Sequence, residues 1–195
     1  MEEEADRGGG RRWRVLRVHA GMEERCEAYL EEEGVEVLLP MRVTVKQEDR
    51  RKRRATAPLF PGYLFAHFDE WEWSEVSHAP GMVERGGEGE AAVTVDPAEA
   101  AQLKVLRNAP ERLGVVGFPL PPPGGRIEVG SGPLQGLTGE VIGRRGRLYV
   151  VVRVTAVGQA AWAYVPVHEL VGVGVGALPR VALSGWPQPV GVGLP

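Results

Sequence analysis

The 195-residue chain has a single cysteine, Cys26, and few aromatic residues, which make up 7% of it. One cysteine cannot form a disulfide framework or a metal site built from several thiolates, so both are excluded within this chain. Such cysteine usage favours a reducing, cytoplasmic setting. We expect Cys26 to be a small buried hydrophobic side chain and not a reactive thiol.

The chain also lacks a long hydrophobic run and a strong charge of either sign. We find no uncharged run of about 18 apolar residues that has the features of a membrane helix. The N-terminus starts acidic, without the apolar core of a signal peptide, so we expect no membrane association. The formal net charge is −3. Any contact with nucleic acid must therefore come from a local basic patch.

Sequence signatures of common catalytic sites are absent as well. There is no phosphate-binding glycine loop with a lysine, no G-x-S-x-G and no H-E-x-x-H. The four histidines lack metal-ligand spacing, and no carboxylate pair is placed for acid–base chemistry. We therefore predict that the protein is not an enzyme and needs no cofactor or metal. An enzyme with an unrecognised site is the weakest alternative, and in it His67 would line the site instead of being a core or rim residue.

The 27 glycines and 16 prolines are concentrated toward the C-terminal half and help to divide the chain. We expect residues 1–11 to be a disordered tail. Residues 12–107 predict strand, helix, strand, strand, helix, strand, helix, an α+β sandwich with an antiparallel sheet. Residues 108–124 are rich in proline and glycine and predict a linker. Residues 125–173 alternate valine-rich runs with glycines, which is typical of a small β-barrel, and residues 174–195 predict a flexible tail.

The strongest strand signal is residues 58–68, PLFPGYLFAHF. Large apolar groups alternate onto both faces of this segment, so we expect a strand at the centre of its sheet. Pro61 cannot donate a ladder hydrogen bond, so pairing should begin at or after Gly62. Phe60 then lies in the turn before the strand, where it is either exposed to a partner or a plug of the core.

Helical patterns surround this strand. Apolar residues recur along residues 21–33 with the spacing of one helix face. Residues 69–79 predict a short helix with Trp71 and Val76 on its inner side. Asp96 and Pro97 predict a helix start, followed by an apolar face of Ala100, Leu103 and Leu106.

Five consecutive basic residues precede the strand, in what we expect to be the tip of a hairpin: Arg50, Arg51, Lys52, Arg53 and Arg54. They are either a solvated charged loop or a contact to nucleic acid, because clustered arginine and lysine release counterions from phosphates. Such contacts position a protein without reading base sequence.

Several motifs resemble those of one family. Residues 59–65, LFPGYLF, resemble the L-F-P-G-Y-hydrophobic signature of NusG-type transcription elongation factors. Residues 80–83, PGMV, resemble that family's T-P-G-V turn, and residues 130–141, GSGPLQGLTGEV, resemble its KOW motif. With Trp13 opening the first strand, these motifs follow the family's order over residues 12–172. The resemblance implies an NGN domain, a linker and an SH3-like KOW barrel.

The resemblance also implies a function and a set of residues. The N-terminal domain would bind the clamp helices of bacterial RNA polymerase and suppress pausing or termination. Its docking residues would be Phe60, Tyr63, Phe65 and Leu103. The basic run would lie near upstream or non-template DNA. The KOW barrel would recruit a small-subunit ribosomal protein or Rho, and a monomer is expected. Gly130, Pro133, Gly136 and Gly139 would be structural residues of the KOW motif, with Gly136 and Gly139 in tight turns.

Two departures qualify the resemblance. Residues 155–159, TAVGQ, replace the aromatic-Gly-Arg segment of general NusG proteins, so this segment does not support binding to Rho or a ribosomal protein. The features around residues 39–61 look closer to specialised paralogues such as RfaH. Because valine and glycine are poor helix formers, we predict a C-terminal domain that is always a β-barrel. The alternative function is a KOW-type RNA- or ribosome-binding module, with RNA binding that depends on Arg144, Arg145 and Arg147.

Overall fold

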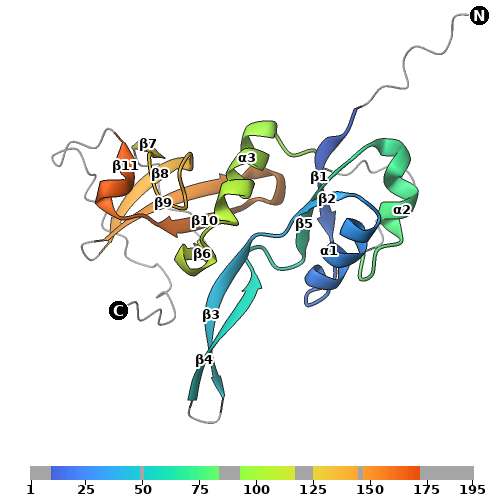
Figure 1. Ribbon diagram of the computed structural model, residues 1–195, viewed down its shortest axis with the longest axis horizontal. Coiled ribbons are helices and arrows are strands. Elements are labelled where there is room, and N and C mark those ends of the chain that lie inside the picture. Colours follow the sequence, from blue (N-terminus) through green and yellow to red (C-terminus); the bar gives the residue numbers. More distant parts are fainter. Residues whose placement is uncertain (1–9, 49–50, 84–92, 117–124, 145–146, 172–195) are drawn as a thin grey trace, which may run out of the picture. The chain divides into compact units, whose positions relative to one another are not determined.

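The chain is divided into two compact units (Figure 1). The computed structural model describes residues 10–48, 51–83, 93–116, 125–144 and 147–171. The first unit consists of Met1–Leu39 and Pro61–Ala100, and the second of Pro40–Phe60 and Ala101–Pro195. Helices are combined with antiparallel sheets, so the predicted α+β class is confirmed.

The first unit is built on a three-stranded antiparallel sheet in the order β1-β5-β2. Its strands are β1 (Arg12–Arg17), β5 (Tyr63–Phe68) and β2 (Glu36–Leu38). β5 pairs with β1 from Tyr63 onward and with β2 from Phe65, which confirms the prediction of a central strand that begins after Gly62. Most side chains of β5 are buried because both sides of a central strand are covered.

The far edge of β1 is occupied by short extended segments. The Val15 N–H donates to the Val93 carbonyl (2.9 Å), and the Val95 N–H donates to the Trp13 carbonyl (2.8 Å). At the other end of β1 the Val83 N–H donates to the Arg17 carbonyl (2.9 Å). These bonds satisfy backbone groups that an open edge would leave to solvent.

Three α-helices occur among the described residues: α1 (Glu23–Glu32), α2 (Trp73–Ser77, preceded by the 3-10 turn η1, Glu70–Glu72) and α3 (Pro97–Leu106). Cys26 is fully buried on α1, and burial raises the pKa of its thiol to about 11, with the Glu27 carboxylate adding to the rise. The Ala98 N–H donates to Asp96, as the predicted helix start requires.

The prediction for Trp71 is wrong. Its side chain is 71% exposed, whereas Trp73 stacks on Phe68 with ring centroids 5.9 Å apart. The segment starts as a 3-10 turn, which has three residues per turn instead of 3.6. The positions that face the core therefore differ from those of an α-helix. Val76 is buried, as predicted.

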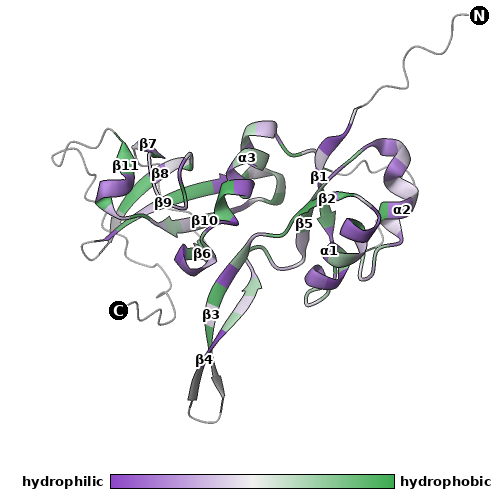
Figure 2. Ribbon diagram, viewed as in Figure 1, coloured by the Kyte–Doolittle hydropathy of each residue, from purple (hydrophilic) through white to green (hydrophobic). Residues whose placement is uncertain are grey.

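The second unit contains a six-stranded antiparallel sheet in the order β11-β7-β8-β9-β10-β6. Figure 2 shows that β9 is largely hydrophobic. The four predicted valine-rich runs are found as β7, β8, β9 and β10, and β6 lies in the segment predicted to be a linker. The bounds are β6 (Leu113–Val115), β7 (Arg126–Val129), β8 (Thr138–Arg144), β9 (Arg147–Val154), β10 (Gln159–Tyr164) and β11 (Leu170–Val171).

A separate two-stranded hairpin belongs to the second unit, formed by β3 (Met41–Glu48) and β4 (Arg51–Pro58). The Leu59 N–H donates to the Pro40 carbonyl (2.7 Å) at its base. Short 3-10 turns connect other elements: η2 (Pro110–Arg112), η3 (Thr155–Val157) and η4 (Val167–Glu169).

The predicted domain limits stay predictions. The predicted tails at residues 1–9 and 172–195, and residues 117–124 of the predicted linker, lie outside the described residues. Arg11, placed in the N-terminal tail, forms an ion pair with Glu72. In the part of the chain that is described, no helix is long and apolar enough to cross a membrane, and no group of three potential metal ligands is found.

Candidate functional site

The turn before β5 is held by a buried carboxylate. Glu23, at the start of α1, is only 2% exposed. Its Oε1 accepts a hydrogen bond from the Gly62 N–H (2.8 Å), and its Oε2 accepts one from the Gly21 N–H (2.6 Å). The carboxylate also lies at a helix N-terminus, where negative charge is favoured. Glu23 therefore fixes the Pro61-Gly62 turn against the first helix.

Gly62 is required by the backbone of this turn. Its φ is +83°, in a region that L side chains rarely adopt, and a Cβ here would lie 3.3 Å from the Val18 carbonyl oxygen. The Val18 N–H also donates to the Gly62 carbonyl (3.0 Å). The added carbon would therefore crowd the same residue that this hydrogen bond joins to Gly62. The signature glycine thus sets the direction in which Tyr63 leaves the turn.

Three of the four predicted docking side chains are buried. Phe60 is 1% exposed, so of the two alternatives left open for this residue the structure shows the core plug. Phe65 and Leu103 are fully buried, and Tyr63 is half-buried. Tyr63 and Phe65 belong to the first unit, whereas Phe60 and Leu103 belong to the second. Their role in docking stays a prediction.

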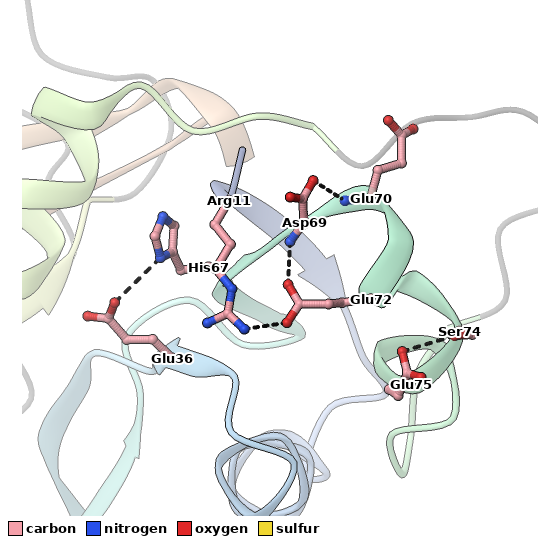
Figure 3. A network of polar contacts seen from close by, with 8 residues as sticks. All are labelled: Arg11, Glu36, His67, Asp69, Glu70, Glu72, Ser74 and Glu75. Atoms are coloured by element: carbon pink, nitrogen blue, oxygen red, sulfur yellow. Dashed lines mark hydrogen bonds and ion pairs between the residues drawn. The ribbon is translucent and has the colours of Figure 1, made fainter. Parts of the chain in front are cut away.

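His67 lies at the rim of the first unit's sheet. Its ring stacks on Trp13, with centroids 5.0 Å apart and planes 22° apart. Its Nδ1 lies 3.6 Å from a carboxylate oxygen of Glu36, the residue opposite it on β2 (Figure 3). These contacts are those of a packed rim histidine.

Beside this histidine, Glu72 organises the end of β5 (Figure 3). Its carboxylate accepts hydrogen bonds from Arg11 and from the Asp69 N–H (2.6 Å). The Asp69 side chain accepts from the Glu70 N–H (2.8 Å) and from the Glu72 N–H, and this second bond completes a capping box with the Glu72 carboxylate at the start of η1. The network fixes local structure and brings together no set of groups for acid–base catalysis.

The basic run lies on the predicted hairpin, but its residues 51–54 belong to strand β4 and not to the tip. In the register of the hairpin, Arg54 pairs with Val45 and Arg53 with Lys46. The Arg53 and Arg54 side chains are exposed. Arg50 and the side chains of Arg51 and Lys52 lie outside what is described. The positions suit contact with phosphates along a two-stranded ribbon, which remains a prediction.

A residue that sequence reasoning missed, Glu169, holds the loop that begins at Gly130. The Gly130 N–H donates to the Glu169 carbonyl (2.7 Å), and the buried Glu169 carboxylate pairs with Arg112 (2.8 Å). A Cβ on Gly132 would lie 2.7 Å from that carboxylate, so glycine leaves room for it. No local pattern could have indicated these contacts, because Arg112 and Glu169 are far apart in the sequence.

The four residues predicted to belong to a KOW motif have different surroundings. A Cβ on Gly130 would lie 2.0 Å from Val171, and Pro133 is exposed. Gly136 has a φ of +84° and lies in a turn, as predicted. Gly139 is not in a turn: it lies within β8, and a Cβ there would be 2.4 Å from the Val151 carbonyl oxygen. The prediction of a tight turn at Gly139 is wrong. Glycine is needed here because the neighbouring strand leaves no space for a side chain, and not because of the backbone angle.

Sequence reasoning also missed a cluster of aromatic rings on the second unit. Tyr149 pairs with Tyr164 across β9 and β10, and Trp162 is the next residue on the same face of β10. The Tyr149 centroid lies 5.3 Å from that of Trp162 and 6.0 Å from that of Tyr164. The Arg147 guanidinium lies over the Tyr164 ring, 5.7 Å from its centroid. We call Tyr149, Trp162 and Tyr164 the aromatic row.

Comparisons with known proteins cover parts of both units. Residues 11–104 match a family model described as NusG, transcription termination factor nusG. The transcription termination/antitermination protein NusG of Thermus thermophilus is 29% identical over an alignment of 157 residues, and the match covers 71% of this chain and 82% of that protein. A solved structure on domain interaction in Thermotoga maritima NusG is 22% identical with a TM-score of 0.48, and the match covers 82% of this chain and 96% of that one.

Proposed function

We infer that the chain is a NusG-like transcription termination/antitermination factor. The observation that carries this inference is the match of residues 11–104 to the NusG family, supported by the similarity to the Thermus thermophilus protein. The matched residues include the Pro61-Gly62 turn that Glu23 fixes. No catalytic step is assigned to the chain.

We further propose that the N-terminal domain, residues 12–107, binds bacterial RNA polymerase at its clamp helices and so suppresses pausing or termination. Aromatic side chains at such a surface supply much of the binding free energy. Tyr63 is the candidate whose ring is partly in solvent. A partner that uses Phe60, Phe65 or Leu103 must first displace the groups that bury them, which lowers its apparent affinity.

The remaining parts of the proposal concern further partners. Arg53 and Arg54, exposed on β4, would contact upstream or non-template DNA. The second unit would recruit another protein, a small-subunit ribosomal protein or Rho, and RfaH-like specialisation to a few operons is part of this proposal. The described strands β7–β11 agree with a C-terminal domain that is always β. We expect the protein to act as a monomer in the cytoplasm.

The test is retention of purified bacterial RNA polymerase by the immobilised full-length protein. We expect Tyr63→Ala to reduce retention about tenfold, the effect of losing one aromatic anchor. Tyr29→Ala is the matched control, because Tyr29 is another half-buried tyrosine of the first unit. Circular dichroism must show that both variants are folded. Failure of the folded wild-type protein to retain polymerase would overturn the proposal.

A further inference from the structure

The aromatic row presents edges and faces of its rings in alternation. The planes of Tyr149 and Trp162 lie 86° apart, and those of Tyr149 and Tyr164 lie 60° apart. All three side chains are half-buried, so each keeps part of its ring in solvent. The rings therefore form a stepped apolar surface, and the indole N–H and the tyrosine hydroxyls add hydrogen-bonding groups to it.

The largest of these rings is held firmly from below. Trp162 pairs with Gly114 across β10 and β6, and a Cβ on Gly114 would lie 2.2–2.8 Å from three atoms of the indole. The indole also packs against a cluster of buried side chains: Val116, Ile142, Val151 and Ala160. This support fixes the ring before anything binds to it, so little side-chain entropy is lost on binding.

A proline-rich segment begins beside this ring. Val116 belongs to the cluster beneath Trp162, and its N–H donates to the Ala160 carbonyl on β10 (2.9 Å). Residues 117–124, with the sequence GFPLPPPG, follow and lie outside the described residues. The description resumes at Gly125, whose carbonyl accepts from the Val141 N–H on β8 (2.9 Å). Both ends of the segment are therefore joined to strands of the same sheet.

The segment is long enough to lie along the aromatic row. A polyproline II helix rises about 3.1 Å per residue, so the stretch from Val116 to Gly125 reaches roughly 28 Å. Neighbouring strands lie about 4.8 Å apart, so β10 and β8, with β9 between them, are separated by roughly 10 Å. The remaining length lets the segment follow β9 and β10, the two strands that carry the row.

The chemistry of the segment suits this surface. Residues 119–122, PLPP, have the P-x-x-P pattern, and three residues per turn place Pro119 and Pro122 on one side of a polyproline II helix. The fixed φ of proline lowers the entropy lost when the segment becomes ordered. Residues 117–124 contain no charged side chain, so no charge is buried on binding.

We propose that residues 117–124 bind to the aromatic row of their own chain as a polyproline II helix. The rings of Pro119 and Pro122 pack against Trp162 and Tyr149, as prolines of P-x-x-P segments pack against aromatic side chains in other proteins. The segment predicted to be a free linker is then part of the surface of the second unit. The proposal concerns this unit alone and does not depend on polymerase binding.

The first test compares the surroundings of Trp162 in full-length proteins. We expect Pro119→Ala/Pro122→Ala to shift the NMR resonance of the Trp162 indole N–H and to make hydroxyl radicals oxidise this ring faster. Pro187→Ala/Pro189→Ala is the matched control, because it removes two spaced prolines from another part of the chain and should change neither readout. Trp71, which is 71% exposed, serves as the reference for the radical dose.

The second test adds a synthetic peptide with the sequence of residues 117–124 to each full-length protein and follows the same resonance. A segment on a short tether has an effective concentration of about 1 mM, so for a peptide Kd of about 0.1 mM the apparent Kd should be about tenfold higher for the wild type than for Pro119→Ala/Pro122→Ala. A peptide with alanine at both of these positions should bind neither protein. These assays contain no polymerase, so their failure is distinct from failure of the proposed function.

Three outcomes would overturn the proposal once circular dichroism has shown that the variants are folded. Equal affinity of the peptide for the wild type and the variant would leave the row free for a separate proline-rich partner. Failure of the peptide to bind either protein would remove proline recognition from this surface. A wild-type dimer that Pro119→Ala/Pro122→Ala converts to a monomer in sedimentation would assign the segment to the row of a second copy.

Discussion

Gly62 in the first unit and Gly139 in the second both belong to sequence signatures, but their surroundings differ. Gly62 has a positive φ, and its N–H is held by a buried carboxylate. Gly139 lies in a strand, and the backbone of β9 occupies the space where its side chain would be. Gly62 is needed for its backbone angle, whereas Gly139 is needed for the close approach of two strands. Substitutions should separate these two requirements.

The largest effect is expected at Gly139. Gly139→Val places a side chain 2.4 Å from the Val151 carbonyl oxygen, and a backbone atom of a paired strand cannot move aside cheaply. We expect a loss of about 3 kcal/mol in the free energy of unfolding, the upper range for overpacking. Urea unfolding measures it, and hydrogen exchange should locate the loosened amides in the second unit. Gly125→Val is the control, because a Cβ there meets nothing within 4 Å.

Glu23→Gln should have the next largest effect, in the other unit. The substitution removes the charge that accepts two backbone hydrogen bonds in a buried place, which we expect to cost about 2 kcal/mol. Hydrogen exchange should show faster exchange at Gly21 and Gly62. Glu24→Gln, at the exposed neighbouring position, should be nearly neutral. Equal losses for the two variants would contradict the role assigned to Glu23.

A substitution series at Gly62 tests the backbone angle itself. Gly62→Ala should cost about 1–2 kcal/mol, because alanine is strained at positive φ. Gly62→Asn should cost less, since asparagine tolerates this region better. At Gly139 the order should reverse, with the larger asparagine worse than alanine. Thermal unfolding of the four variants distinguishes a requirement for positive φ from a requirement for space beside the neighbouring strand.

A smaller effect is expected for the Glu140–Arg153 pair on the face of the second unit's sheet. Both side chains are partly exposed, so Glu140→Gln should lower the free energy of unfolding by only about 0.5–1 kcal/mol. Salt screens such pairs, so the difference from the wild type should shrink in 1 M NaCl, where the Debye length is about 3 Å. A difference that is independent of salt would indicate packing instead.

Near neutral pH, ionisation of the Cys26 thiol should not make the free energy of unfolding depend on pH. Its thiol has a pKa of about 11 in the folded protein against an ordinary 9.0, so folding favours the neutral thiol. This contribution to stability is complete below pH 9 and is lost as the pH rises from 9 to 11. Iodoacetamide should label the native protein at pH 8 far more slowly than the urea-unfolded protein. Equal labelling rates would show that the thiol is accessible.

The sequence predicted those features that depend on neighbours along the chain. The alternation of apolar residues was sufficient to place β5 at the centre of its sheet, and the four valine runs gave four strands of the second unit. The position of Trp71 was wrong because a 3-10 turn and an α-helix direct the same residue differently.

Features that depend on distant residues could not be predicted. β6 has only three residues, between proline- and glycine-rich segments, and its partner β10 comes more than 40 residues later. In the sequence, Glu23 and Glu169 cannot be distinguished from other glutamates, because their partners Gly62 and Arg112 come close only in the folded chain. The aromatic row likewise depends on strand register, because Tyr149 and Tyr164 are paired only in the sheet.

The segment Pro40–Phe60 belongs to the second unit but lies within the sequence of the first. During synthesis it leaves the ribosome before Pro61–Ala100, a stretch of 40 residues that takes roughly 2–8 s to make at about 5–20 residues per second. A hairpin forms in about 1–10 μs, but alone it is marginal and has two open edges. Basic residues on β4 discourage other nascent chains from pairing there. We therefore expect the exposed charges of Arg53 and Arg54 to disfavour edge-to-edge pairing of the newly made hairpin while its own unit is still being translated.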